Sequence, residues 1–172
     1  IRSTAFYEGL SIIERDRAAA YFADEESGAQ VMICSEIGSE GRNFQFAHHL
    51  VLFDLPNNPD LLEQRIGRLD RIGQTEDIKI HIPYIEHSAQ EYLYRWYQQG
   101  INAFSASFSA ANVVYQQFAD QLQTWLSGDT TTQQSDDFEQ LIEQTAEFTQ
   151  QVRIQLEQGR DQLIELNSCN NE

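Results

Sequence analysis

Apolar and polar positions follow two different periods along this chain, and the change comes near residue 88. Before it, short apolar runs at residues 4–7, 30–34 and 50–53 predict strands, and residues 78–84 alternate apolar and polar with a period of two. The run at 30–34 is expected to be a buried strand. The alternating segment contains a proline near its end, so it is expected at or near a sheet edge.

Two helix starts are visible from capping signals. Ser11 followed by Glu14 has capping-box spacing and predicts a helix that ends between residues 24 and 28. Ser88 repeats the signal with a glutamate three residues later and predicts a second helix, with Gly100 as the residue just beyond its end.

The remainder of the chain reads as helical. A helix is expected at about 110–126, with Ser109 as its cap, followed by an exposed polar linker at about 127–137. A long Gln- and Glu-rich helix follows from 137 to about 167. The positions of its mainly apolar stripe step by threes and fours: Phe138, Leu141, Thr145, Phe148, Val152, Leu156, Gly159, Leu163 and Leu166. This stripe must pack against another surface. The candidates are an antiparallel helix from outside this sequence, the surface of a lobe, a second copy of the chain, or the helix's own domain.

Together these patterns predict an α/β domain at residues 1–87, with a parallel sheet and flanking helices. An all-α region with a long helix follows at 88–172. The composition supports a folded chain, because 41% of the 172 residues are apolar and 11% are aromatic.

The most informative stretch is residues 64–74, Q-R-I-G-R-L-D-R-I-G-Q. Asn58 is a good N-cap and Pro59 suits the first helical position. A helix from there would place three side chains on one face at i, i+4 and i+7: Gln64, Arg68 and Arg71. Two guanidiniums beside an amide suit a multiply charged oxyanion such as a triphosphate. The alternative is a solvated basic stripe.

A glycine-containing loop, S-E-I-G-S-E-G-R-N-F at residues 35–44, precedes this stretch and follows a predicted strand. Gly38 and Gly41 permit close backbone approach, so loop amides can meet phosphate oxygens. Ser35 offers a hydroxyl, and Asn43 an amide that can meet a ribose or hold the loop. A purely structural turn is the alternative.

The order of these segments resembles motifs V and VI of the second motor lobe in the Swi/Snf-type branch of helicase superfamily two. The resemblance covers residues 6–74, and the R-I-G-Q ending is typical of that branch. The sequences of both motifs are similar to those of the bacterial RNA polymerase-associated ATPases in the Swi/Snf-type branch. The resemblance continues less distinctively through R-W-Y at 95–97 and L-E-Q-G-R-D-Q-L at 156–163. A chromatin-remodelling relative with the same lobe is a weaker alternative.

The resemblance implies a partial RecA-like helicase C-terminal lobe, belonging to an ATP-driven motor on double-stranded DNA or another nucleic acid. ATP and Mg²⁺ would bind between this lobe and the protein's own N-terminal RecA-like lobe. The implied catalytic residues are Arg71, as the arginine finger, and Arg68, as a second phosphate contact. The implied nucleotide-contacting residues are Gln64, Gly41 and Asn43, and the implied nucleic-acid contacts are Ser35 and Gly38. RNA polymerase is the implied protein partner, and the cytoplasm, close to the nucleoid, the implied location.

The sequence lacks the phosphate-binding and magnesium-binding motifs that such an active site also needs. None of the nine glycines precedes a lysine, so a G-x-x-x-x-G-K-[ST] phosphate loop is impossible, and no D-E-x-H segment occurs. The chain alone is therefore expected to be inactive and to bind neither ATP nor Mg²⁺. The chain begins at Ile1 and has Met32 as its only methionine, so we expect it to be part of a longer protein.

The net charge of -16 bears on which partners the second half can bind. Residues 76–172 contain fifteen acids against four bases, so this half is not expected to bind nucleic acid by itself. A partner with a basic surface, or solubility, explains the charge better. The alternative function is therefore a non-catalytic acidic helical module that docks to RNA polymerase, with the lobe as its scaffold. No apolar run is long enough for a membrane span, and His48 and His49 lack the neighbours of a metal site.

Overall fold

The computed structural model describes residues 1–35, 44–105, 109–127 and 135–169, and its contacts divide the chain into two compact units. Unit 1 comprises Ile1–Leu50 and Gln64–His81, and unit 2 comprises Val51–Glu63 and Ile82–Glu172. The division does not follow a single point near residue 87, because residues 51–63 belong to the helical unit.

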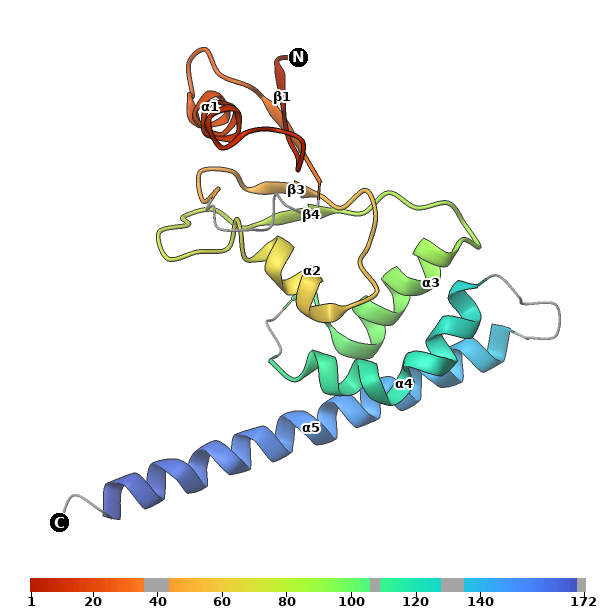
Figure 1. Cartoon of the computed structure of the whole chain (residues 1–172). Helices are drawn as coiled ribbons and strands as arrows, with labels where there is room; N and C mark the ends of the chain where they lie inside the picture. The colour runs from red at the N-terminus through yellow and green to blue at the C-terminus, as the bar shows by residue number, and fades with distance from the viewer. Residues whose placement is uncertain (36–43, 106–108, 128–134, 170–172) are drawn as a thin grey trace. The chain divides into compact units, whose positions relative to one another are not determined.

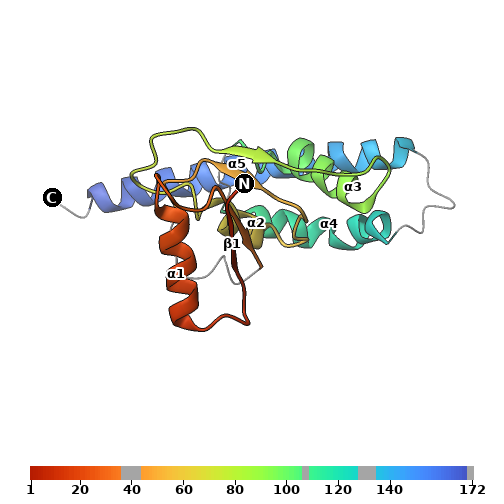
Figure 2. The same ribbon diagram turned by 90° about the horizontal axis from the view of Figure 1, so that it is seen from above.

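Unit 1 opens with a strand, a helix and a second strand, as predicted. Strand β1 (Ser3–Phe6) pairs in parallel with β2 (Val31–Cys34), and helix α1 (Ile12–Ala23) connects them and packs beside β1 (Figures 1 and 2). The register places Ser3 opposite Val31 and Phe6 opposite Cys34. This parallel βαβ unit confirms the α/β class.

The capping box of α1 is present in both directions. The Glu14 amide donates to Ser11 Oγ at 3.3 Å, and the Ser11 amide donates to Glu14 Oε2 at 2.8 Å. The side-chain and backbone hydrogen bonds from Ser11 lower the pKa of the Glu14 carboxyl. Local hydrogen bonds therefore begin this helix where the sequence indicated.

Four phenylalanines form an aromatic cluster in the described part of unit 1. Phe44 lies among the other three, with ring centroids 6.4 Å from Phe6, 6.1 Å from Phe22 and 6.2 Å from Phe46, all in edge-on geometry. Phe6 and Phe44 are buried. Phe44, the last residue of the glycine-containing segment at 35–44, is thus part of the core.

The expectation of a buried strand at 30–34 is wrong. Val31 is 44% exposed and Ile33 is 66% exposed. The two side chains share one face of the strand because successive residues alternate between faces. An apolar run predicts burial only where elements cover both faces, and this face of β2 is open in the described part of unit 1.

A second two-stranded sheet contains β3 (His49–Val51) and β4 (Lys79–His81). The Lys79 amide donates to the His48 carbonyl at 2.8 Å where the two segments meet. The predicted strand at 78–84 is therefore present but shorter, since residues 82–85 have no strand structure.

From Ile82 onward, the described residues of unit 2 form four helical elements: α3 (Ala89–Arg95), the π-helical turn η2 (Trp96–Ile101), α4 (Ala111–Leu126) and α5 (Ser135–Cys169). Helices α4 and α5 lie side by side, and η2 packs on α5 (Figures 1 and 2). Trp96, Tyr97 and Ile101 of η2 are fully buried. These three residues are therefore part of the core of unit 2.

Three predicted helix ends in unit 2 need correction. Gly100 lies inside η2, and the left-handed residue that ends the turn is Asn102, with φ of 59°. Ser109 is not the cap of α4, because Ala110 occupies the N-cap position without a side-chain hydrogen bond. Helix α5 begins at Ser135, within the expected linker at 127–137. Residues 128–134 of that linker lie outside the described part.

The apolar stripe of α5 packs on its own unit along its first half. Phe138, Leu141, Thr145 and Val152 are buried, whereas Ile154 and Leu156 are 43% and 37% exposed. For residues 138–152, the helix's own domain is therefore the covering surface. Within the described residues, no helix has the length and apolar character needed to cross a bilayer.

Candidate nucleotide-contacting site

The arginine stretch begins in helix α2 (Pro59–Ile66), which starts as predicted. Asn58 Oδ1 accepts a hydrogen bond from the Asp60 amide at 2.8 Å, and the Asn58 carbonyl accepts from the Leu61 and Leu62 amides. Asn58 thus satisfies amides at the helix start that have no partner within the helix. Gln64 lies in the last turn, and its side chain is exposed.

The predicted helix is too long, and its shared face for Gln64, Arg68 and Arg71 is wrong. Helix α2 ends at Ile66, and the chain continues in a turn. The Leu69 and Asp70 amides both donate to the Ile66 carbonyl at 3.0 Å. Gly67, a poor helix former, stands at the break, and the next apolar residue, Leu69, is buried. The two arginines are therefore held by a turn rather than by a helical surface.

Arg68 connects this turn to the end of the glycine loop. The Phe44 amide donates to the Arg68 carbonyl at 2.8 Å, and the Arg68 side chain is half-buried. The structure thus brings the end of the first motif against the second. Gly38, Gly41 and Asn43 lie outside the described residues.

Arg71 occupies the first position of a tight turn and has an exposed side chain. The Gln74 amide donates to the Arg71 carbonyl at 2.9 Å, and Gly73, the third residue of the turn, has φ of +102°. A positive φ at that position is what a type II turn requires and what glycine adopts most easily. The glycine of R-I-G-Q is therefore explained by the backbone conformation of this turn.

Gln74 is a positioning residue that the sequence interpretation missed. Its Nε2 donates to the Ala47 carbonyl at 3.1 Å and to the Leu69 carbonyl at 3.3 Å, while its Oε1 accepts from the Thr75 and Glu76 amides. One carboxamide thus joins both sides of the arginine turn to the chain before β3. The R-I-G-Q ending pointed to Gln74 as a residue of the family pattern, but it did not indicate which backbone groups Gln74 bonds to.

Ser35 lies elsewhere in unit 1, at the ends of the parallel strands. Its hydroxyl donates to Glu8 Oε2 at 2.8 Å, and its amide donates to the Phe6 carbonyl at 3.1 Å. The Arg15 guanidinium donates to the Glu8 carbonyl at 2.8 Å at the same edge. The Ser35 hydroxyl and amide are thus both hydrogen-bonded within unit 1, and its contact with nucleic acid stays a prediction.

The histidines of the second sheet form a small cluster. His49 Nδ1 and His81 Nε2 are 2.9 Å apart, and the two rings are within 10° of parallel. Desolvation, followed by the charges of His48, Lys79 and His81, lowers the pKa of His49. No group of three or more potential ligands that could hold a metal ion occurs among the described residues.

Unit 2 holds the segment that leads into α2. Gln90 Nε2 donates to the Phe53 and Pro83 carbonyls at 2.9 and 2.7 Å, and Gln90 Oε1 accepts from the Leu55 amide at 3.3 Å. The buried Tyr97 hydroxyl donates to the Pro56 carbonyl at 2.7 Å. The segment that precedes α2 is therefore held by residues of α3 and η2.

Two family models match the chain, one for each part. The helicase conserved C-terminal domain matches residues 1–73, and the RNA polymerase recycling family C-terminal model matches residues 77–172. The second model covers more than half of the chain.

Curated relatives agree with these matches. The chain is 57% identical over 169 residues to the RNA polymerase-associated protein RapA of Vibrio parahaemolyticus, and 58% identical over 168 residues to that of Vibrio vulnificus. These alignments cover 98% of this chain, which spans 17% of the length of either relative.

A solved structure shares the fold. The C-terminal part of the Fun30 ATPase domain superposes with a TM-score of 0.51 at 19% identity, over 73% of this chain and 39% of that chain. The α/β lobe with appended helices thus has the fold of an ATPase C-terminal part. With both family models and these relatives in agreement, the chain belongs to the RNA polymerase recycling family.

Proposed function

We propose that this chain contributes the second lobe of a two-lobed ATP motor that moves on nucleic acid and acts on RNA polymerase. The helicase C-terminal match over residues 1–73 supports the motor lobe. The observation that carries the proposal is the arginine turn, where the exposed Arg71 lies three residues from the half-buried Arg68. Backbone hydrogen bonds from Phe44 and Gln74 hold the two arginines in this turn.

The donor set fits a phosphate anion. Arg71 and Arg68 provide guanidinium N–H groups, and Gln64 provides a carboxamide within the preceding helix. In this proposal Arg71 stabilises the negative charge that develops on the transferred phosphoryl, and Arg68 and Gln64 contact the nucleotide. The described residues contain no carboxylate cluster for Mg²⁺, so the ion and the phosphate loop are assigned to the other lobe.

The 172-residue chain alone should therefore show no ATP hydrolysis above background. The reason is that a guanidinium stabilises phosphoryl transfer only when ATP is already bound and oriented. The measurement is phosphate release by the purified chain with ATP and Mg²⁺. Turnover that disappears in the Arg71→Ala variant of the same chain would contradict the two-lobe proposal.

Unit 2 supports a second function, docking to a basic surface of RNA polymerase. Its residues include sixteen acids against three bases. The recycling-family model covers nearly all of its helical part. A surface with this charge repels nucleic acid and attracts basic protein patches.

Immobilised chain should accordingly capture purified RNA polymerase, and the captured fraction should fall steeply as salt rises, because exposed charges are screened. The whole chain is the right bait, since deletion of residues 1–87 would remove Pro56, Pro59 and Leu62 from the core of unit 2. Capture that is absent at low salt, or unchanged by salt, would contradict charge-driven docking.

A further inference from the structure

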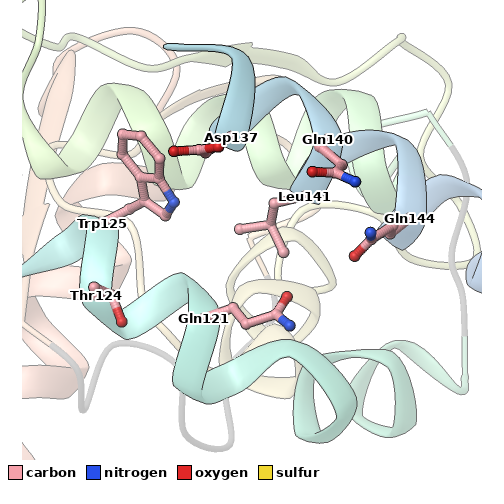
Figure 3. A pocket seen from close by; sticks show the side chains of 7 residues that line it. All are labelled: Gln121, Thr124, Trp125, Asp137, Gln140, Leu141 and Gln144. Atoms are coloured by element: carbon pink, nitrogen blue, oxygen red, sulfur yellow. The ribbon is translucent and has the colours of Figure 1, made fainter. Parts of the chain in front are cut away.

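An open pocket of about 310 Å³ lies between α4 and α5 of unit 2 (Figure 3). Helix α4 lines it with Gln121, Thr124 and Trp125, which share one face at i, i+3 and i+4. Helix α5 lines the opposite side with Asp137, Gln140, Leu141 and Gln144, again on one face. Both helices thus present a row of side chains to the same space.

Every polar side chain of this pocket can accept a hydrogen bond, and the carboxamides and the hydroxyl can also donate one. Three carboxamides, one hydroxyl and the Asp137 carboxylate surround the opening, and their side chains are exposed. Trp125 and Leu141 are 6% and 4% exposed and form the apolar floor. The described lining residues include no lysine or arginine, and the unit around them is strongly acidic. The arrangement suits a cation with a flat, partly apolar body.

The neighbouring surface already holds such a group. Arg95 forms an ion pair with Glu139, and its guanidinium carbon lies 5.2 Å from the centre of the Phe138 ring. The Phe138 ring is in turn 5.0 Å from the Trp125 ring. A carboxylate beside an aromatic ring therefore binds a guanidinium on one side of this aromatic cluster, and the pocket repeats the combination with Asp137 and Trp125.

We propose that the pocket binds an arginine side chain of the partner protein. A guanidinium carries five N–H donors in one plane, so it can donate to the Asp137 carboxylate and to the carboxamide oxygens at the same time. Its flat, weakly hydrated body can lie on the apolar floor that Trp125 and Leu141 form. A lysine ammonium is a compact, strongly hydrated charge and gains less from this set of acceptors. The proposal rests on the docking function of unit 2 and names the residue that unit 2 recognises.

Two short peptides, acetyl-Gly-Arg-Gly-amide and acetyl-Gly-Lys-Gly-amide, test the pocket in the 172-residue chain. We expect the arginine peptide to bind more tightly and to shift the NMR signals of the Trp125 indole and the Gln140 and Gln144 amides. Asp137→Asn should weaken arginine binding by about tenfold, the value of one charge-assisted hydrogen bond. Asp136→Asn is the matched control, because it makes the same charge change in the same helical turn outside the pocket.

Equal binding of the two peptides, or equal loss in both variants, would overturn the arginine pocket and leave only general charge attraction. Polymerase capture separates this failure from failure of the docking function. If the Asp137→Asn chain captures RNA polymerase as well as the unaltered chain does, and the unaltered chain shows no preference for the arginine peptide, the pocket proposal alone is overturned. Arginine preference with no capture of polymerase by the unaltered chain supports the pocket and overturns the docking function.

Discussion

Replacing Arg71 by alanine in the full-length protein should lower kcat for ATP hydrolysis by roughly 10³-fold or more, as loss of an arginine finger does in other NTPases. The Arg71 side chain is exposed, and its turn is held by backbone and Gln74 contacts that alanine retains. The variant should therefore fold normally. ATP affinity should change little, because in the proposed motor the other lobe makes most of the contacts to the nucleotide. A fall in kcat without a rise in KM identifies an interaction made in the transition state.

Two further variants make this result specific. Arg71→Lys keeps the charge but loses the planar donor geometry, so it should recover little of the lost activity. Arg17→Ala removes an equally exposed arginine from α1 and should leave turnover nearly unchanged. Turnover within a few-fold of the unaltered protein would show that Arg71 is not an arginine finger, and unfolding of the Arg71→Ala variant would assign Arg71 a structural role instead.

Local signals predicted the elements of the fold better than their lengths. The helix starts after Ser11 and Asn58 could be predicted because their capping bonds join residues two or three apart. The break after Ile66 could not, since it depends on burial of Leu69 and on the bond between Phe44 and Arg68, which are 24 positions apart. Helical periodicity alone therefore extended α2 through both arginines.

The candidate site shows the same division. Its residue types were readable from the spacing of Gln64, Arg68 and Arg71, but their arrangement depends on Gln74 contacts that reach back to Ala47. Residues 51–63 belong to unit 2, where Gln90 bonds to Phe53 and Tyr97 bonds to Pro56, each across more than thirty positions of sequence. Contacts of this range leave no periodic trace in the sequence.

Gly100 illustrates how such a contact gives a residue its meaning. Its position at the expected end of a helix suggested a left-handed cap, yet the structure buries it in η2 against α5. A Cβ at this position would lie 2.8 Å from Thr145 Cγ2 and 3.1 Å from Thr145 Cβ. Thr145 cannot easily move, because its Oγ1 donates to the Leu141 carbonyl at 2.7 Å and accepts from Trp96 Nε1 at 3.0 Å. The glycine is needed for close approach of two segments rather than for backbone freedom.

Gly100→Ala should consequently destabilise unit 2 by about 2 kcal/mol, within the range for overpacking a buried site. Urea unfolding followed by fluorescence of Trp96 and Trp125 measures this, since both tryptophans belong to unit 2. Gly159→Ala is the matched control: a Cβ added there would meet no described atom within 4 Å beyond its own helical turn, so it should stabilise α5 by about 0.5–1 kcal/mol. Thr145→Ser removes the clashing methyl but keeps both hydrogen bonds. The free energy of unfolding of the Gly100→Ala, Thr145→Ser double variant should therefore be at least about 1 kcal/mol higher than the sum of the two single effects predicts. If the two effects simply add, the contact between Gly100 and Thr145 does not set the packing of η2 on α5.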